Sequence, residues 1–83
     1  MKDWKNHKVM VKILDLIDAI TAVYEIRDDG KECQRGLYLD YRNWKYYIYK
    51  TMEDKKYFTS GCVFESYNLN EIKIYLTGFL DAL

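Results

Sequence analysis

Two aspartates, Asp15 and Asp18, are the first side chains in the sequence whose spacing could support catalysis. They lie three residues apart in a segment of helical periodicity, so they share one helix face. A catalytic carboxylate pair needs one carboxyl buried in a cleft, where burial raises its pKa. Lys8 and Lys12 lie on the same polar stripe. A stripe of aspartates and lysines on one side of a helix indicates a face exposed to solvent.

The other reactive side chains are isolated from one another in the sequence. His7 is the only histidine, and no nucleophile or acid that it could orient lies near it. Cys33 and Cys62 lack metal-ligand spacing; we expect Cys33 to be the more reactive thiol in a polar loop and Cys62 to be a small buried hydrophobe. The acidic turn at residues 28–32 lacks the alternating ligands of a calcium loop. The sequence therefore predicts a protein without catalytic activity, metal or cofactor.

Aromatic side chains are the most unusual feature of the composition. They make up 17% of the chain, nine of them are tyrosines, and four lie within "NWKYYIYK" at residues 43–50. Exposed tyrosines beside basic residues can stack on single-stranded nucleic acid. Tyrosine is also enriched among the residues that contribute most of the binding energy at protein interfaces. A third interpretation is that the tyrosines serve packing alone, because strands favour this residue. The choice depends on the elements that position these rings.

Residues 8–27 predict an amphipathic helix, because their apolar side chains fill one arc at 3.6 residues per turn. Asp3 and Asn6 are the candidate N-caps, and Gly30 is the expected left-handed residue after the helix. Three acidic side chains lie on the polar side of this helix: Asp15, Asp18 and Glu25.

Residues 37–41 and 44–52 alternate as two strands that a tight turn at residues 42–43 would join. The side chains expected on the core face are Leu37, Leu39, Tyr41, Trp44, Tyr46 and Ile48. Those expected on the opposite face are Tyr38, Asp40, Lys45, Tyr47 and Tyr49. In this register Tyr38 opposes Tyr47, and Asp40 forms an ion pair with Lys45.

Residues 57–65 predict a third strand, with a bulge expected at Gly61. An odd-length loop before this strand, or a compensating bulge, would place Phe58, Cys62 and Phe64 on the core face.

A second helix is predicted after Asn68, which stands as N-cap three residues before Glu71, the spacing of a capping box. Tyr67 and Ile72 occupy the positions of a hydrophobic staple. Gly78 within this helix predicts close packing against another element.

The predicted fold is α+β with the order α-β-β-β-α: a three-stranded antiparallel sheet with two amphipathic helices in a single domain spanning 1–83. Thirteen basic and thirteen acidic residues give zero formal charge, which removes the general attraction to nucleic acid. The chain shows no signal peptide or membrane span, and reduced thiols fit the cytoplasm. So short a chain has a thin stability margin, and a homodimer through Val11 and Ile26 is a further expectation.

The candidate binding residues form three sets. A protein partner could contact the sheet face through Tyr38, Lys45, Tyr47 and Tyr49. It could instead contact the first helix through Asp15, Asp18 and Glu25. A nucleic acid would use Tyr38, Arg42, Lys45, Tyr47 and Tyr49.

Lys, Ile, Tyr and Asn account for 30 of the 83 residues, and proline is absent. In this composition and in its length the chain resembles the small proteins of phages and mobile elements of low-GC bacteria, which include anti-CRISPR and other host-defence inhibitors. The resemblance implies a protein that binds and blocks a host complex such as a CRISPR-type effector. The alternative is a nucleic-acid-binding regulator.

Overall fold

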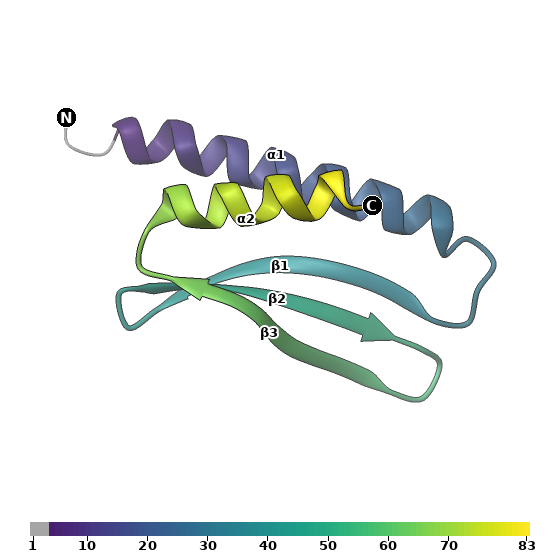
Figure 1. The fold of residues 1–83 in the computed structure, drawn as a ribbon. Coiled ribbons are helices and arrows are strands. Elements are labelled where there is room, and N and C mark those ends of the chain that lie inside the picture. Colours follow the sequence, from purple (N-terminus) through teal and green to yellow (C-terminus); the bar gives the residue numbers. More distant parts are fainter. Residues whose placement is uncertain (1–3) are drawn as a thin grey trace.

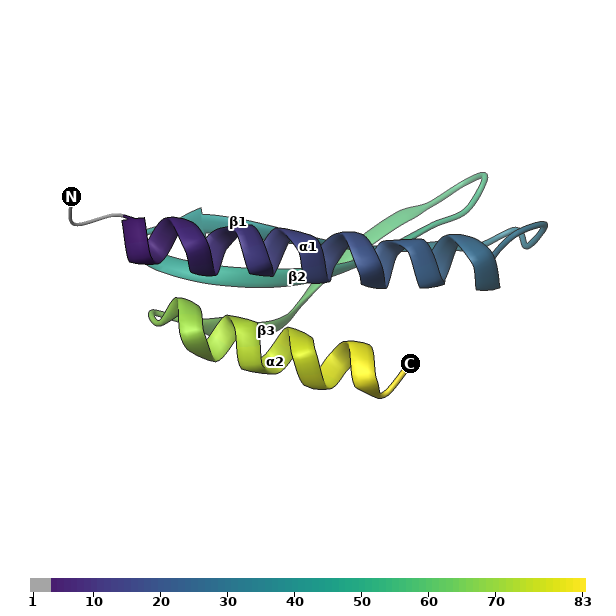
Figure 2. The same cartoon turned by 90° about the horizontal axis from the view of Figure 1, so that it is seen from above.

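The two helices lie side by side over one face of a three-stranded sheet (Figures 1 and 2). The computed structural model describes residues 4–83. The elements follow in the order α1 (Trp4–Arg27), β1 (Gln34–Arg42), β2 (Lys45–Glu53), β3 (Phe58–Ser66) and α2 (Leu69–Asp81). The strands pair antiparallel in the order β1-β2-β3. The predicted α-β-β-β-α fold is confirmed, and both helices cover the same face of the sheet.

Helix α1 begins four residues earlier than predicted, at Trp4, and ends at Arg27 as predicted. Asn6 therefore lies within the helix and is not its cap, whereas Asp3 lies outside the described residues. Gly30 has a φ of 76°, which confirms the left-handed residue expected beyond the helix.

The core lies between the helix layer and the inner face of the sheet. The buried apolar side chains are Ile13, Ile17, Ile20, Tyr24, Leu37, Ile48, Leu69, Ile72 and Leu76. Those of α1 recur at steps of three and four residues, which places them on one helix face. Tyr75 of α2 stacks on Phe64 of β3 at 4.4 Å between ring centroids, and this contact holds α2 against the edge of the sheet.

An ion pair with a buried carboxylate connects the end of α1 to the start of β1. Asp28 is only 2% exposed and accepts hydrogen bonds from the Arg35 Nη2 at 2.8 Å and from the Arg35 backbone N–H at 3.0 Å. The Arg35 guanidinium lies over the Tyr24 ring, 4.4 Å from its centroid. The hydrogen bond from Arg35 is the main reason why the pKa of Asp28 is lowered. One carboxylate thus holds the start of β1 to the end of α1.

The β1–β2 hairpin turns at Asn43 and Trp44, one position later than predicted. The observed pairs are shifted by two residues, so that Leu39 opposes Ile48 and Tyr38 opposes Tyr49. Because side chains alternate with a period of two, this shift keeps the other strand side chains on their predicted faces. It moves Trp44 out of the strand, so the prediction that Trp44 belongs to the core is wrong.

Strand β3 reaches the core face only in its second half. Four residues, 54–57, connect it to β2, so Phe58 opposes Glu53 on the outer face. The register then shifts by one residue, leaving Val63 without a partner and bringing Phe64 opposite Ile48. The predicted bulge thus exists, two residues beyond Gly61, and Phe64 lies inward as expected. Phe58 and Cys62 are exposed, and their predicted core positions are wrong.

Helix α2 begins with the predicted cap, in a modified form. The Asn68 side chain accepts the Asn70 N–H at 2.8 Å. The Asn68 N–H donates to the Ser66 hydroxyl at 3.0 Å, and that hydroxyl in turn donates to the carboxylate of Glu71. A serine therefore relays the contact that a capping box makes directly.

Two further predictions about α2 are wrong. Tyr67 is 71% exposed and does not act as a hydrophobic staple. Gly78 is exposed, and a Cβ built there would have no heavy atom within 4 Å, so it marks no close packing.

Truncating a core isoleucine of α1 should be far more costly than truncating an exposed one. Ile20 is fully buried, and we expect Ile20→Ala to lower the free energy of unfolding by about 2–5 kcal/mol. Ile26 in the same helix is 78% exposed, and Ile26→Ala should change it by no more than about 0.5 kcal/mol. Urea denaturation of the two variants measures both values. Equal losses would contradict the placement of the helix.

Asp28 should make the stability of the protein depend on pH. Its pKa in the folded chain lies below the ordinary 3.8, so it stabilises the fold above that value, and this contribution is lost as the pH falls through the lowered pKa. We expect the urea midpoint to fall as the pH drops from about 5 to about 3, and to fall less in Asp28→Asn. Asp18→Asn on the exposed face of α1 is the control. An unchanged pH slope in Asp28→Asn would refute this role.

Candidate binding surface

The outer face of the sheet is left open, because both helices lie on the inner face (Figure 1). Five side chains of β1 and β2 form what we call the tyrosine face: Tyr38, Arg42, Lys45, Tyr47 and Tyr49. The structure therefore brings together all the residues that the sequence proposed for the sheet. They lie on two paired strands whose backbone is fixed by the ladder of the hairpin.

The rings of this face contact one another. Tyr38 and Tyr49 stack with their centroids 5.1 Å apart and their planes 13° apart. Tyr47 follows at 6.2 Å from Tyr49, and the Arg42 guanidinium lies over the Tyr47 ring at 4.2 Å. Arg42 also donates a hydrogen bond to the Tyr49 hydroxyl. The rings thus form a continuous layer held in place by its own members.

Acidic side chains accompany both cations of the tyrosine face. The Lys45 Nζ lies 2.9 Å from Glu65 Oε1, and this hydrogen bond raises the pKa of Lys45. The Arg42 Nε lies 3.5 Å from Asp40 Oδ2. The ion pair predicted between Asp40 and Lys45 is therefore replaced by two others. The face carries paired charges and not an excess of positive charge.

Trp44, at the tip of the β1–β2 hairpin, is the residue that sequence reasoning missed. Asn43 and Trp44 have φ values of 51° and 66°, so both central residues of the turn are left-handed, as in a type I′ turn. Asparagine tolerates this conformation, but a bulky residue does so at a cost of roughly 1–2 kcal/mol. The Trp44 side chain is nevertheless 81% exposed. Strain of this kind is most often retained where it serves a function.

The tip of the hairpin adjoins the basic end of the tyrosine face. The Lys45 Nζ lies 5.1 Å from the ring centroid of Tyr67, which is itself largely exposed. We call Arg42, Trp44, Lys45 and Tyr67 the hairpin end. Tryptophan, tyrosine and arginine are the three residue types most enriched at the energetic centres of interfaces, and the hairpin end contains one of each.

The acidic candidates form a separate surface. Asp15, Asp18 and Glu25 are all exposed on α1, in the helix layer. The sheet and the core separate them from the tyrosine face, so the two proposed sets do not form one site (Figure 1).

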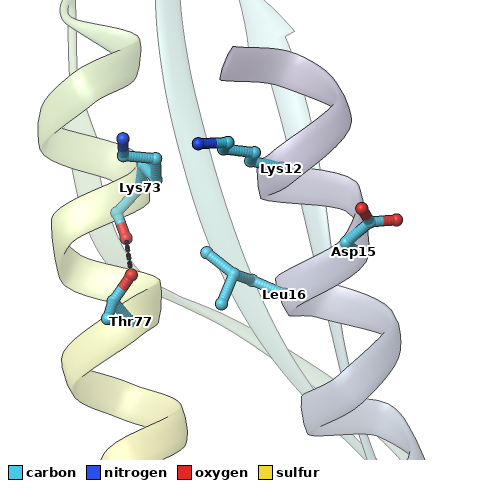
Figure 3. Close-up of a pocket in the computed structure, with 5 residues that line it drawn as sticks. All are labelled: Lys12, Asp15, Leu16, Lys73 and Thr77. Atoms are coloured by element: carbon cyan, nitrogen blue, oxygen red, sulfur yellow. Dashed lines mark hydrogen bonds between the residues drawn. The ribbon is translucent and has the colours of Figure 1, made fainter. Parts of the chain in front are cut away.

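A shallow groove runs between α1 and α2 on the helix layer (Figure 3). Lys12 extends from α1 toward α2 and Leu16 lies one turn further along α1, whereas Lys73 and Thr77 line the groove from α2. Thr77 donates its hydroxyl hydrogen to the Lys73 carbonyl at 2.8 Å. Asp15 also lines the groove, although its carboxylate is turned away from α2 in this view.

The thiols differ from expectation in their exposure. Cys62 is exposed and Cys33 is half-buried, and both are free. The reason for the exposure of Cys62 is the bulge at Val63, which leaves the first half of β3 in the outer-face register. Within residues 4–83 no three histidine, cysteine or acidic side chains gather as metal ligands.

Comparison of the chain with known proteins covered protein families, curated proteins and solved structures. No significant match was found in any of the three. Neither of the two helices in the described part of the chain is long and apolar enough to cross a membrane.

Replacing the strained tryptophan should stabilise the fold. Glycine adopts the left-handed conformation freely, so we expect Trp44→Gly to raise the free energy of unfolding by about 1 kcal/mol. Asn43→Gly in the same turn should raise it by less, since asparagine already tolerates a positive φ. Urea denaturation compares the two variants with the wild type. A destabilised Trp44→Gly would show that the tryptophan contributes to folding and not to a surface.

Proposed function

We propose that the chain is a non-enzymatic protein-interaction module that docks through the tyrosine face and the hairpin end. The observation that carries the proposal is Trp44, which is 81% exposed in a left-handed turn position that suits glycine. A folded chain gains nothing in its own core from this side chain. Its large apolar surface is instead available to fill a pocket of a partner.

Ring geometry favours a protein over a nucleic acid. A stacking platform needs ring faces that are free to receive bases. Here Tyr38 and Tyr49 stack on each other, and Arg42 lies over the Tyr47 ring. A partly exposed cluster of rings with polar hydroxyls suits the surface of another protein.

The charge of the face supports the same choice. Binding to phosphates releases counterions only where cations are available to replace them. Lys45 is paired with Glu65 and Arg42 with Asp40, so a phosphate backbone would meet carboxylates beside each cation. Paired charges at the rim of an apolar patch are typical of protein interfaces.

Preorganisation supports tight binding by so small a surface. A flexible side chain loses rotamer freedom when it is fixed at an interface, by about 0.5–1.5 kcal/mol each. The tyrosine rings are already fixed by stacking and by the hydrogen bond from Arg42 to Tyr49. Trp44 would be the anchor residue. The surrounding tyrosine rings would exclude water from it.

The compositional resemblance to small phage and mobile-element proteins suggests what such binding achieves. A module with these features would act stoichiometrically, as an inhibitor that occupies a surface of a host protein complex such as a CRISPR-type defence effector. This role places its action in the cytoplasm of a low-GC bacterium.

Capture from a lysate of a low-GC bacterium, with matched variants as bait, tests the proposal. We expect one protein to be retained by the wild type and by Asn43→Gly, and to be lost with Trp44→Gly and with Tyr47→Ala. Loss of an anchor should weaken binding of the purified protein by about 2 kcal/mol or more, roughly thirtyfold. Asp15→Asn on the helix layer should bind like the wild type.

Two outcomes would overturn the proposal. The first is retention by Trp44→Gly with loss in Asp15→Asn, which would transfer the function to the acidic side of α1. The second is salt-dependent binding of a labelled single-stranded oligonucleotide that Tyr47→Ala and Tyr49→Ala abolish, which would favour the nucleic-acid regulator.

A further inference from the structure

The two edges of the sheet differ in how they are protected. At the β1 edge, the Arg35 N–H donates to Asp28 Oδ2 at 3.0 Å, and the Tyr41 N–H donates to Asp40 Oδ1 at 2.9 Å. Two carboxylates of the same chain thus occupy backbone donors that a further strand would need. Capping and charge at an edge are ordinary means of preventing strand addition.

The β3 edge lacks such protection. Residues 58–63 are exposed throughout, and no charged residue occurs from Phe58 to Phe64. Helix α2 packs over the end of β3, whereas the first half of the strand curves away from it in the β2–β3 hairpin (Figures 1 and 2). No other strand within residues 4–83 pairs with this edge. A long, uncharged and uncovered edge is a template for another strand.

The direction of the backbone groups follows from the ladder. The N–H groups of Arg35 and Tyr41 point away from β2, since they bond to carboxylates. Backbone direction alternates along a strand, so Gly36, Tyr38 and Asp40 bond to β2. The same alternation continues through the pairing of β1 with β2 and of β2 with β3. It directs the backbone N–H and C=O groups of Gly61 toward Lys50 of β2. The backbone groups of its neighbours, Ser60 and Cys62, therefore point to the free edge.

The sequence around Gly61 is its own complement. Two copies of β3 that run antiparallel about this residue place Ser60 opposite Cys62 and Thr59 opposite Val63. Each of these pairs joins side chains of similar size and shape, and Gly61 meets Gly61 of the second copy. Directly opposed residues of an antiparallel pair contact each other, so this register brings no charges and no bulk together at its centre.

We propose that the β3 edge binds a second copy of this chain, with the two β3 strands antiparallel and centred on Gly61. Ser60 and Cys62 of each copy then exchange backbone hydrogen bonds with Cys62 and Ser60 of the other. The result is a continuous six-stranded sheet with all four helices on one face. Its two-fold axis is perpendicular to the sheet, so both tyrosine faces lie on the same side and form a bivalent surface.

A lysine at the centre of the interface tests the proposal. Gly61 has no left-handed φ, and a Cβ built there has no heavy atom within 4 Å, so Gly61→Lys is compatible with the folded chain. It places two ammonium groups directly opposite each other. We expect the wild type to reach twice the 10.1 kDa chain mass in light scattering, and the dimer dissociation constant of Gly61→Lys to rise at least about tenfold.

The matched control is Gly78→Lys, which adds the same charge at an equally open glycine on α2. It should dimerise like the wild type, and far-UV circular dichroism should show that both variants are folded. A wild type of monomeric mass at every concentration would overturn the proposal, whether the edge then stays free or takes a strand of another protein. So would a dimer that Gly61→Lys leaves intact, as a dimer through Val11 and Ile26 would be.

A covalent trap tests the register separately. With Cys33→Ser and Cys62→Ser as background, Gly61→Cys places a thiol opposite its own copy. We expect mild oxidation to give a disulfide-linked dimer from Gly61→Cys and not from Gly78→Cys in the same background. Equal cross-linking of the two would contradict the register. These readouts measure mass alone, so they are independent of the proposed partner protein.

Discussion

One-sided covering of the sheet is the constraint on which the rest of this structure depends. Three strands offer two faces, and the two helices found within residues 4–83 both pack on the inner face around Ile48. The outer face must therefore remain stable in water with whatever side chains alternate onto it. Its tyrosines stack on one another and its cations find acids, so the open face is ordered by its own contacts. That order makes it suitable as a binding surface.

At the hairpin tip, the residue that would stabilise the turn differs from the residue suited to binding a partner. The pair of Asp28 and Arg35 and the relayed cap at Ser66 are examples of polar groups with partners, and no buried side-chain nitrogen or oxygen within the described residues lacks one. Against that background a tryptophan in a left-handed turn position stands out, because glycine would relieve the strain. Natural sequences retain such conflicts mainly at sites of function. The open β3 edge is a second place where the chain forgoes protection that it provides at β1.

Much of the fold could be predicted because its signals are periodic. The 3.6-residue period placed both helices, and strand alternation assigned Tyr38, Tyr47 and Tyr49 to one face. The two-residue alternation of strands explains the error at Trp44. A register shift of two residues leaves every side chain on the same face, so the pattern of faces does not determine where the turn lies. The asparagine at position 43 was the signal for a type I′ turn.

Phe58 and Cys62 were misplaced because the bulge at Val63 has no local sequence signature. The stacking of the tyrosines and the pairing of Lys45 with Glu65 depend on contacts between strands, which the sequence does not display.

The most direct test of the central claim is amide chemical-shift mapping of the labelled chain as the captured protein is added. If the tyrosine face and the hairpin end form the docking surface, the largest shifts will fall on residues 42–49, and the amides around Asp15 and Asp18 will be unchanged. Shifts concentrated on the exposed side of α1, with an undisturbed β1–β2 hairpin, would contradict the account.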